Sequence, residues 1–340
     1  MKKKIENYLL ENACPSIKYR VKKEVKNSIS LSEEENLIKE IMRDDLVRDI
    51  SLRQNKNGWI DLDFHHKKGV ETSVRVLAQK GIDKKHIYQE KMLHELEKRE
   101  NSFDDGGLFK VGKVLDDKGF GGSNLIRATI FAYAGEEEKD FIKTQIRKAL
   151  IKFEYVLKVN SLEDIIKPYR NKYVFKAGVM WPSIYDLRIL AYTYGWRSNE
   201  NLNLLIGAVQ KLINLSPIPN INVLHKSQLI SPASFCMHSF NSELTTMKDK
   251  EWMMWFHRME LLSRIGVVKH IKELNEQVCY LLNLLDKSEG LFAKRLSHYY
   301  FNKWGTYTGL ALEKDWKTQG RRICDLSFRS LLILHYSEVQ

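Results

Sequence analysis

Apolar residues recur with the period of an α-helix through most of the chain. Four stripes follow the i, i+3, i+4, i+7 spacing that places apolar side chains on one helix face. These stripes are Ile142, Ile146, Leu150, Phe153 and Leu157; Leu202, Leu205, Ile206, Val209, Leu212 and Ile213; Trp252, Trp255, Phe256, Met259 and Leu262; and Ile271, Leu274, Val278, Leu281, Leu282 and Leu285. Strand-like alternation is nearly absent, so the pattern predicts an all-α protein.

The expected helices come in pairs separated by loops. These pairs span 17–54, 69–98, 123–159, 184–214 and 248–285. A two-helix unit cannot bury its own apolar face and must stack on neighbours, which gives a solenoid or a closed ring. The longest non-helical stretches are 100–122 and 214–241, and no low-complexity linker divides the chain. We therefore expect one continuous helical-repeat domain over residues 1–340.

Composition and charge limit the classes of protein to which the chain can belong. Apolar residues make up 43% of the 340, and no apolar run reaches the about 18 residues of a membrane span. Glu6, Asn7 and Glu11 interrupt any signal-peptide core, and four well-separated cysteines without a CxxC pair fit a reducing compartment. We expect a cytoplasmic protein. The net charge of +12 suits a polyanionic partner, and equally a solvated basic surface.

The run Gln54–Trp59, with the sequence QNKNGW, is similar to the glutamine–tryptophan motif of squalene cyclases and protein prenyltransferases. Weaker similarity extends over about residues 14–337. The resemblance implies an α/α toroid, a helical barrel with inner and outer rings. It also implies that the Gln54 side chain ties a helix end to the turn at Gly58 and Trp59. The glycine and tryptophan are adjacent here, whereas the family pattern has a residue between them.

The catalytic motifs of these families are incomplete in this chain. Class II terpene cyclases use DxDD, and Asp61 and Asp63 supply two carboxylates before Phe64 ends the match. The DDxxD motif that holds magnesium is also incomplete at Asp104-Asp105 and at Asp116-Asp117, and no zinc-binding trio is recognisable. Asp61, Asp63, Asp104 and Asp105 are nevertheless the candidate catalytic carboxylates, with loop capping as the alternative. We expect no metal and no cofactor, and the sequence leaves open whether the protein is an enzyme.

Two further groups of residues are candidates for ligand binding. An aromatic wall around a central cavity would suit a hydrophobic small molecule, although the same residues could be core packing. Its members would be Tyr185, Tyr192, Trp196, Trp252, Trp255, Tyr299, Trp304 and Tyr307. A phosphate could be bound by Arg321, Arg322 and Arg329. Alternatively, Arg322 could pair with Asp325 along a helix.

Three functional hypotheses follow from these patterns. The first is a toroid that binds, and in one version transforms, a hydrophobic small molecule. The second is an open HEAT-like solenoid that binds nucleic acid through its basic surplus. The third is a non-catalytic scaffold for a protein partner. Cys236 with His238 offers a less favoured nucleophile or metal pair.

Overall fold

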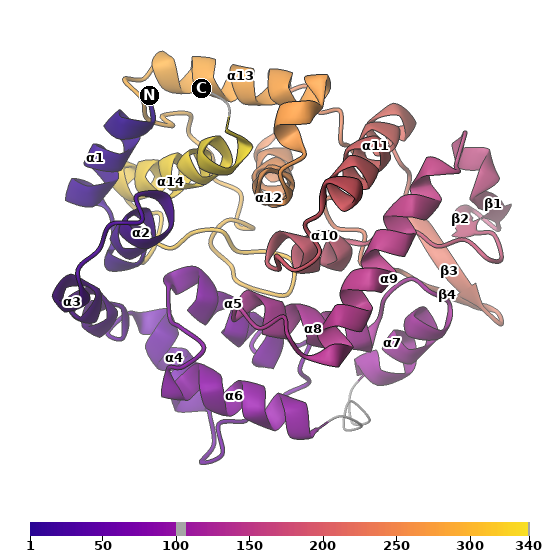
Figure 1. The fold of residues 1–340 in the computed structure, drawn as a ribbon, viewed down its shortest axis with the longest axis horizontal. Coiled ribbons are helices and arrows are strands. Elements are labelled where there is room, and N and C mark those ends of the chain that lie inside the picture. The colour runs from indigo at the N-terminus through magenta and orange to yellow at the C-terminus, as the bar shows by residue number, and fades with distance from the viewer. Residues whose placement is uncertain (100–106, 339–340) are drawn as a thin grey trace.

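Helices dominate the computed structural model, which describes residues 1–99 and 107–338 (Figure 1). The α-helices are α1 (Lys2–Asn12), α2 (Pro15–Arg20), α3 (Leu31–Ile41), α4 (Asp45–Arg53), α5 (Val70–Lys80), α6 (Ile87–Lys98), α7 (Gly107–Asp117), α8 (Ser123–Tyr133), α9 (Asp140–Leu157), α10 (Ile184–Ala191), α11 (Asn199–Leu215), α12 (Asp249–Ile265), α13 (Lys272–Asp286) and α14 (Gln319–Ser337). A π-helical turn, Val21–Val25, continues α2. The expectation of a helix-rich protein is confirmed.

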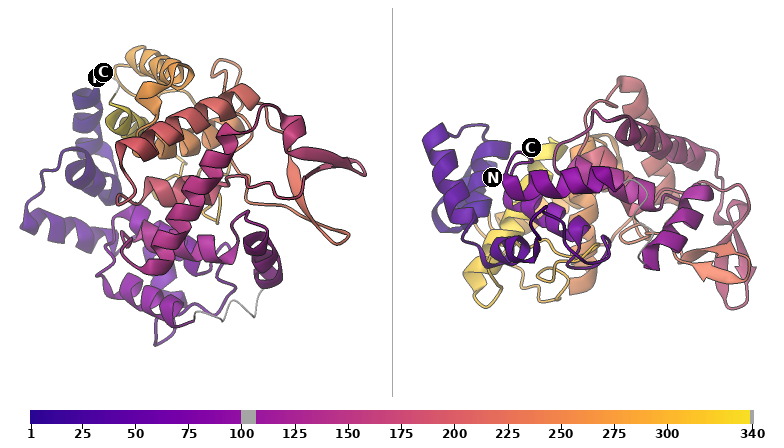
Figure 2. Two further views of the ribbon diagram at one scale, coloured as in Figure 1. Left: turned by 45° about the vertical axis from the view of Figure 1, so that its right-hand side comes forward. Right: turned by 90° about the horizontal axis from the view of Figure 1, so that it is seen from below.

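A small mixed sheet departs from the all-α prediction. Its strands are β1 (Ile166–Tyr169), β2 (Lys172–Phe175), β3 (Ile221–His225) and β4 (Gln228–Ile230), in that spatial order. The two outer pairings are antiparallel, whereas β2 and β3 are parallel. Each strand has three to five residues, which is too short for a period-two pattern to stand out from its surroundings. Figure 2 shows the sheet at one end of the molecule.

The helix pairs have nearly the boundaries that the periodicity predicted. Later pairs occupy 70–98, 123–157, 184–215 and 249–286. The stretch expected as the first pair contains three helices, because Asp44 begins a new helix there. Its Oδ1 accepts hydrogen bonds from the backbone of Leu46 and Val47, which is the geometry of an N-cap.

Six helices contact one another in cyclic order, and we call them the inner helices. α2 packs against α5, α5 against α8, α8 against α10, α10 against α12, α12 against α14, and α14 against α2. Four of them, α5, α8, α10 and α12, are the first helices of their pairs. α1 packs along α14, so the two ends of the chain form a further pair (Figure 1). The buried apolar side chains form one contiguous cluster across these elements.

The glutamine–tryptophan turn closes the end of α4. Gln54 follows the last residue of the helix, and its Nε2 donates to the carbonyl oxygens of Gly58 at 3.1 Å and Tyr88 at 2.7 Å. Gly58 has a φ of +92°, and a Cβ at this position would lie 2.2 Å from the Cβ of Lys91. Only glycine fits both the backbone angle and this approach. The turn therefore fixes α4 against α6.

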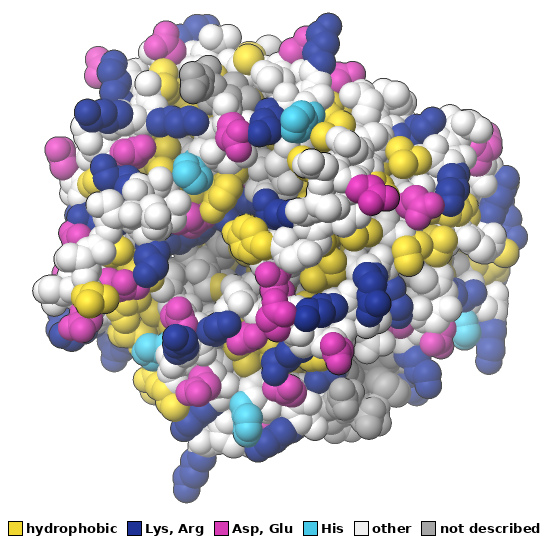
Figure 3. Space-filling model, viewed as in Figure 1, with side chains coloured by type: hydrophobic (Ala, Val, Ile, Leu, Met, Phe, Trp, Pro, Cys, Tyr) yellow, Lys and Arg dark blue, Asp and Glu magenta, His cyan; other side chains and the backbone are white. Residues whose placement is uncertain are grey.

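The described residues contain no helix with both the length and the apolar character needed to cross a lipid bilayer. On the face seen in Figure 3, acidic and basic side chains are interspersed rather than gathered into single-sign fields. This face therefore carries no extended patch of a single charge sign.

Candidate functional site

Residues 304–312 run between the inner helices, and we call this stretch the central segment. It belongs to the long coil between α13 and α14, drawn in yellow in the middle of Figure 1. Cationic side chains of the inner helices donate to its carbonyl oxygens. These contacts are Arg75 to Gly305, Thr308 and Gly309; Arg188 to Thr306; Arg329 to Leu310; and Lys80 to Leu312. Backbone dipoles thus solvate buried charges that water does not reach.

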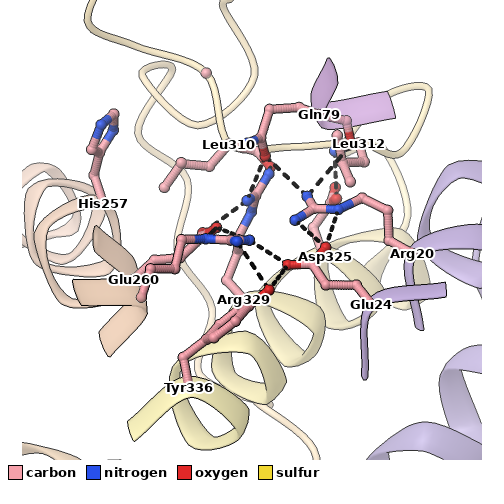
Figure 4. Close-up of polar contacts among 12 residues, drawn as sticks. Arg20, Glu24, Gln79, His257, Glu260, Leu310, Leu312, Asp325, Arg329 and Tyr336 are labelled. Carbon is pink, nitrogen blue, oxygen red and sulfur yellow. Dashed lines mark hydrogen bonds and ion pairs between the residues drawn. The ribbon is translucent and has the colours of Figure 1, made fainter. Parts of the chain in front are cut away.

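Arginines and glutamates alternate along a buried network beside this segment (Figure 4). Arg329 Nη1 lies 2.8 Å from Glu260 Oε2, and the other carboxylate oxygen of Glu260 lies 3.2 Å from Arg264 Nη2. Arg264 also contacts Glu24, whose second oxygen is 2.7 Å from Arg20 Nη2. The network joins α2 and its π-helical turn to α12 and α14.

The arginines keep the glutamates of this network ionised. Burial favours the neutral form of Glu24, but the charges of Arg20 and Arg264 outweigh it and lower the pKa of that carboxyl well below its usual range. Burial likewise opposes ionisation of Glu260, and the charges of Arg329 and Arg264 lower its pKa. Both groups are therefore negative at neutral pH.

A second polar group surrounds Glu71, a fully buried residue of α5. Its carboxylate accepts a hydrogen bond of 2.6 Å from the Tyr185 hydroxyl and lies 2.6 Å from Nδ1 of His65. Arg188 is farther away, with Nη1 at 4.0 Å. Burial opposes protonation of His65, but its hydrogen bond to Glu71 raises the pKa of the imidazole. The ring of Tyr307 packs against both His65 and Tyr185.

A small cavity of about 20 Å³ lies among the inner helices. It is lined by Arg75, Gln79, Tyr133, Arg188, Tyr192, His257, Glu260, Leu261, Leu310 and Arg329. Among the described side chains on this wall, three buried atoms have no hydrogen-bond partner: Arg75 Nε, Tyr133 Oη and His257 Nδ1. The space holds one or two water-sized particles, too little for an organic ligand.

A larger pocket of about 390 Å³ opens between α4, α5 and the coil around the central segment. Its volume lies in the range of small-molecule sites. Most of the lining residues are of polar or charged type, and the full set is Asp44, Asp45, Leu46, Asp49, Ile50, Arg53, Lys67, Lys68, Thr72, Ser73, Val76, Lys80, Asn302, Trp304, Ala311, Glu313, Lys314 and Asp315. We call it the α4–α5 pocket.

The charges on the wall of the α4–α5 pocket largely compensate one another. Five basic and five acidic side chains line it, and several pair directly. The shortest of these pairs joins Lys80 Nζ to Asp44 Oδ2 at 2.7 Å, and Lys314 Nζ lies 3.0 Å from Asp45 Oδ2. The buried hydroxyl of Ser73 on the same wall has no partner within the described chain. The pocket thus offers polar contacts without a strong net charge.

Glu313 is the lining residue with the most unusual acidity. Burial, followed by the negative charge of Asp325, raises the pKa of its carboxyl to about 7. Its Oε1 accepts a hydrogen bond of 2.7 Å from the backbone N–H of Cys14. A carboxyl of this acidity is protonated in about half of the molecules at neutral pH, as a general acid or base requires.

The aromatic residues expected around one cavity lie in several places. Trp252 and Trp255 pack on each other and on Phe256 in the core, with their ring centroids 5.4 Å apart. Trp196 lines a separate pocket of about 430 Å³, and Tyr299 is exposed at the surface.

The remaining four aromatic residues lie close to the central segment or belong to it. Tyr185 and Tyr307 contact each other near Glu71, and Tyr192 lines the small cavity. Trp304 lies under the guanidinium of Arg75, whose Cζ is 4.9 Å from the ring centroid. Their surroundings are polar, because each of these places also holds a charged side chain.

The candidate carboxylates do not form one site in the described residues. Asp61 is exposed, and Asp63 accepts a hydrogen bond of 2.9 Å from the backbone of His65, as a loop-capping residue does. Asp116 similarly accepts from the backbone of Gly122 and Asn124. Asp104 and Asp105 lie outside the described residues.

The three arginines expected at a phosphate have separate partners. Arg321 pairs with Asp315 at 2.7 Å, Arg322 donates to the carbonyl oxygen of Trp316, and Arg329 is buried in the network of Figure 4. Asp325 does not pair with Arg322. It accepts hydrogen bonds from Leu312, Glu313 and Trp316 instead.

The less favoured pair Cys236 and His238 also lacks the geometry of a reactive site. Burial raises the pKa of the Cys236 thiol to about 12, so the thiolate is scarce at neutral pH. His238 Nδ1 lies 3.0 Å from the carbonyl oxygen of Ile218. Within the described part of the chain, no cluster of three or more His, Cys, Asp or Glu side chains could hold a metal ion.

Most of the charged residues that occupy the centre carry no distinguishing signal in the sequence. Glu71, Arg75 and Gln79 repeat every four residues on α5, and such a polar stripe on an amphipathic helix normally faces water. The positions of His257 and Glu260 on α12 are equally hard to recognise from the sequence. Comparisons with family models, curated proteins and solved structures found no match for this chain.

Proposed function

We propose that the chain is an α/α toroid whose site for a neutral, hydroxyl-bearing small molecule is the α4–α5 pocket. The cyclic order of contacts among the inner helices supports the toroid, together with the pairing of α1 and α14. A solenoid open at its ends would leave the first and last repeats without a common neighbour. The same contacts count against the open solenoid considered for nucleic acid.

The composition of the pocket wall is the observation that supports the proposed class of ligand. Basic and acidic side chains are equal in number and largely paired, so a polyanion gains little net attraction there. A paired carboxylate can still accept a hydrogen bond from a ligand hydroxyl, and a paired ammonium group can still donate one to it. Trp304 and Ala311 add apolar contact, which matches the mixed surface of a sugar, polyol or nucleoside.

This ligand class differs from the hydrophobic molecule that the family resemblance implied. An isoprenoid chain would have to displace the hydrogen bonds between inner-helix cations and the central segment, leaving buried charges unsatisfied. The α4–α5 pocket needs no such rearrangement because it is already open. Glu313 is the residue in it that would exchange a proton with a bound hydroxyl.

Thermal unfolding with a panel of neutral probes tests the proposal. The panel contains monosaccharides, polyols and nucleosides, with farnesyl diphosphate as the contrasting probe. We expect saturable stabilisation by at least one neutral probe, because binding to the folded state alone raises stability. Stabilisation by farnesyl diphosphate alone would favour the apolar ligand instead, and no response to any neutral probe would refute the proposal.

A matched pair of variants locates the binding. Asn302 is exposed and lines the pocket, whereas Asn283 is exposed on α13, away from it. Asn302→Leu should weaken the response to the active probe several-fold, because one amide loses its hydrogen bonds. Asn283→Leu should leave it unchanged. Equal responses from both variants would place the probe elsewhere.

A further inference from the structure

The small cavity among the inner helices is surrounded by buried charge that does not balance. Five arginines and three glutamates lie in the network, in the group around Glu71 and on the cavity wall. These are Arg20, Arg75, Arg188, Arg264 and Arg329, with Glu24, Glu71 and Glu260. Among these arginines, Arg75 is the one without a carboxylate oxygen within 4.0 Å, in a region where unpaired charge is costly.

The guanidinium without a carboxylate partner is that of Arg75, and Arg188 lies beside it on the cavity wall. Within the described residues, Arg75 has only neutral hydrogen-bond partners, which are backbone carbonyl oxygens of the central segment. Arg188 approaches Glu71 no closer than 4.0 Å and otherwise bonds to a carbonyl oxygen and an imidazole. Both arginines line the cavity.

The unpaired atoms on the cavity wall can all act as donors. Arg75 Nε always carries a proton, and the Tyr133 hydroxyl is free to donate. Burial, with the charges of Arg188 and Arg75, lowers the pKa of His257 well below its usual range, so its ring is neutral. Its Nε2 accepts hydrogen bonds from Arg188 at 3.3 and 3.4 Å, which assigns the single ring proton to Nδ1.

We propose that this cavity binds a monatomic anion such as chloride. Three side chains that line this space of about 20 Å³ each carry a donor without a partner, and the guanidinium of Arg75 among them has no carboxylate partner. A water molecule could accept from the donors, but it would leave the charge excess in place. Phosphate, sulfate and organic anions exceed the space.

The carboxylate on the same wall does not exclude an anion. Glu260 lines the cavity, but both of its oxygens are engaged by Arg329 and Arg264. Its charge is thus neutralised locally, and the donors come from three inner helices: α5, α8 and α12 each supply one. The anion would thereby join three inner helices at their common centre.

Bromide provides the direct test, because it replaces chloride and scatters anomalously. Crystals of the full chain grown in sodium bromide should show an anomalous peak bounded by Arg75, Tyr133 and His257. In solution, bromide should stabilise the protein saturably relative to sodium gluconate at equal ionic strength. A cavity that holds only water in the bromide crystals would refute the proposal.

Two tyrosine variants distinguish bromide binding in the cavity from a general effect of salt on stability. Tyr133→Phe removes one donor without changing the ring and should raise the half-saturating bromide concentration about tenfold, as expected for a hydrogen bond to a charged group. Tyr194→Phe makes the same chemical change at an exposed position and should match the wild type. An unchanged half-saturation in Tyr133→Phe would place the bromide effect outside the cavity.

Discussion

The carboxyl of Glu313 makes stability depend on pH in a direction opposite to that of most glutamates. In the unfolded chain this group ionises near its usual value of 4.5, whereas in the folded protein its pKa is about 7. Between these values the folded state binds more protons than the unfolded state. Stability attributable to this residue therefore falls as pH rises from about 4.5 to 7.

The size of the effect follows from the same two values. A pKa displaced from 4.5 to about 7 corresponds to about 3 kcal/mol. The side chain is only partly buried, and solvent screening reduces the figure to about 1–2 kcal/mol. Glu313→Gln keeps the acceptor for the Cys14 N–H but cannot ionise. The variant should exceed the wild type in stability by about 1–2 kcal/mol at pH 8 and equal it at pH 4.5.

Urea denaturation at pH 4.5, 6 and 8 measures this difference for the wild type and the variant. Glu40→Gln is the control, because Glu40 is an exposed glutamate on α3 and should show no comparable pH-dependent gain. A constant difference at all three pH values would show that Glu313→Gln acts through packing. A loss of stability at pH 8 would refute the assigned environment of Glu313.

Three further substitutions test the architecture by denaturant unfolding. Glu260→Gln should lower the unfolding free energy by about 3–5 kcal/mol, because Arg329 loses its carboxylate partner and Arg264 loses one of two; a cost below about 1 kcal/mol would contradict that. Leu9→Ala should cost about 2–5 kcal/mol although it is near the chain end, because this fully buried side chain belongs to the helix that packs on α14; an effect typical of a frayed terminus would argue against the α1–α14 pair. Gln54→Ala should cost about 1–2 kcal/mol by freeing the carbonyl oxygens of Gly58 and Tyr88, and Gln210→Ala on α11, whose half-buried amide bonds only to side chains, should cost less.

Periodicity located the helix pairs because each buries one stripe locally. Periodicity does not predict the surroundings of a side chain where segments distant in the sequence pack against it. The polar stripe of α5 faces inward only because residues 304–312 return to meet it, more than 200 positions later. The strands β1 and β3 were missed for a related reason. Their pairing runs through β2 and brings together segments on either side of α10 and α11.

A polar centre gives the central segment one defined position. An apolar coil packed against apolar helices could slide with little change in energy, since the hydrophobic effect is not directional. Here Arg75, Arg188 and Arg329 each require particular carbonyl oxygens, so a shift by one residue would leave buried donors unsatisfied. The segment ends at Leu312, directly before Glu313, and that position sets the wall of the α4–α5 pocket. The buried arginines therefore act on the proposed ligand site by holding its wall in place, without touching the ligand.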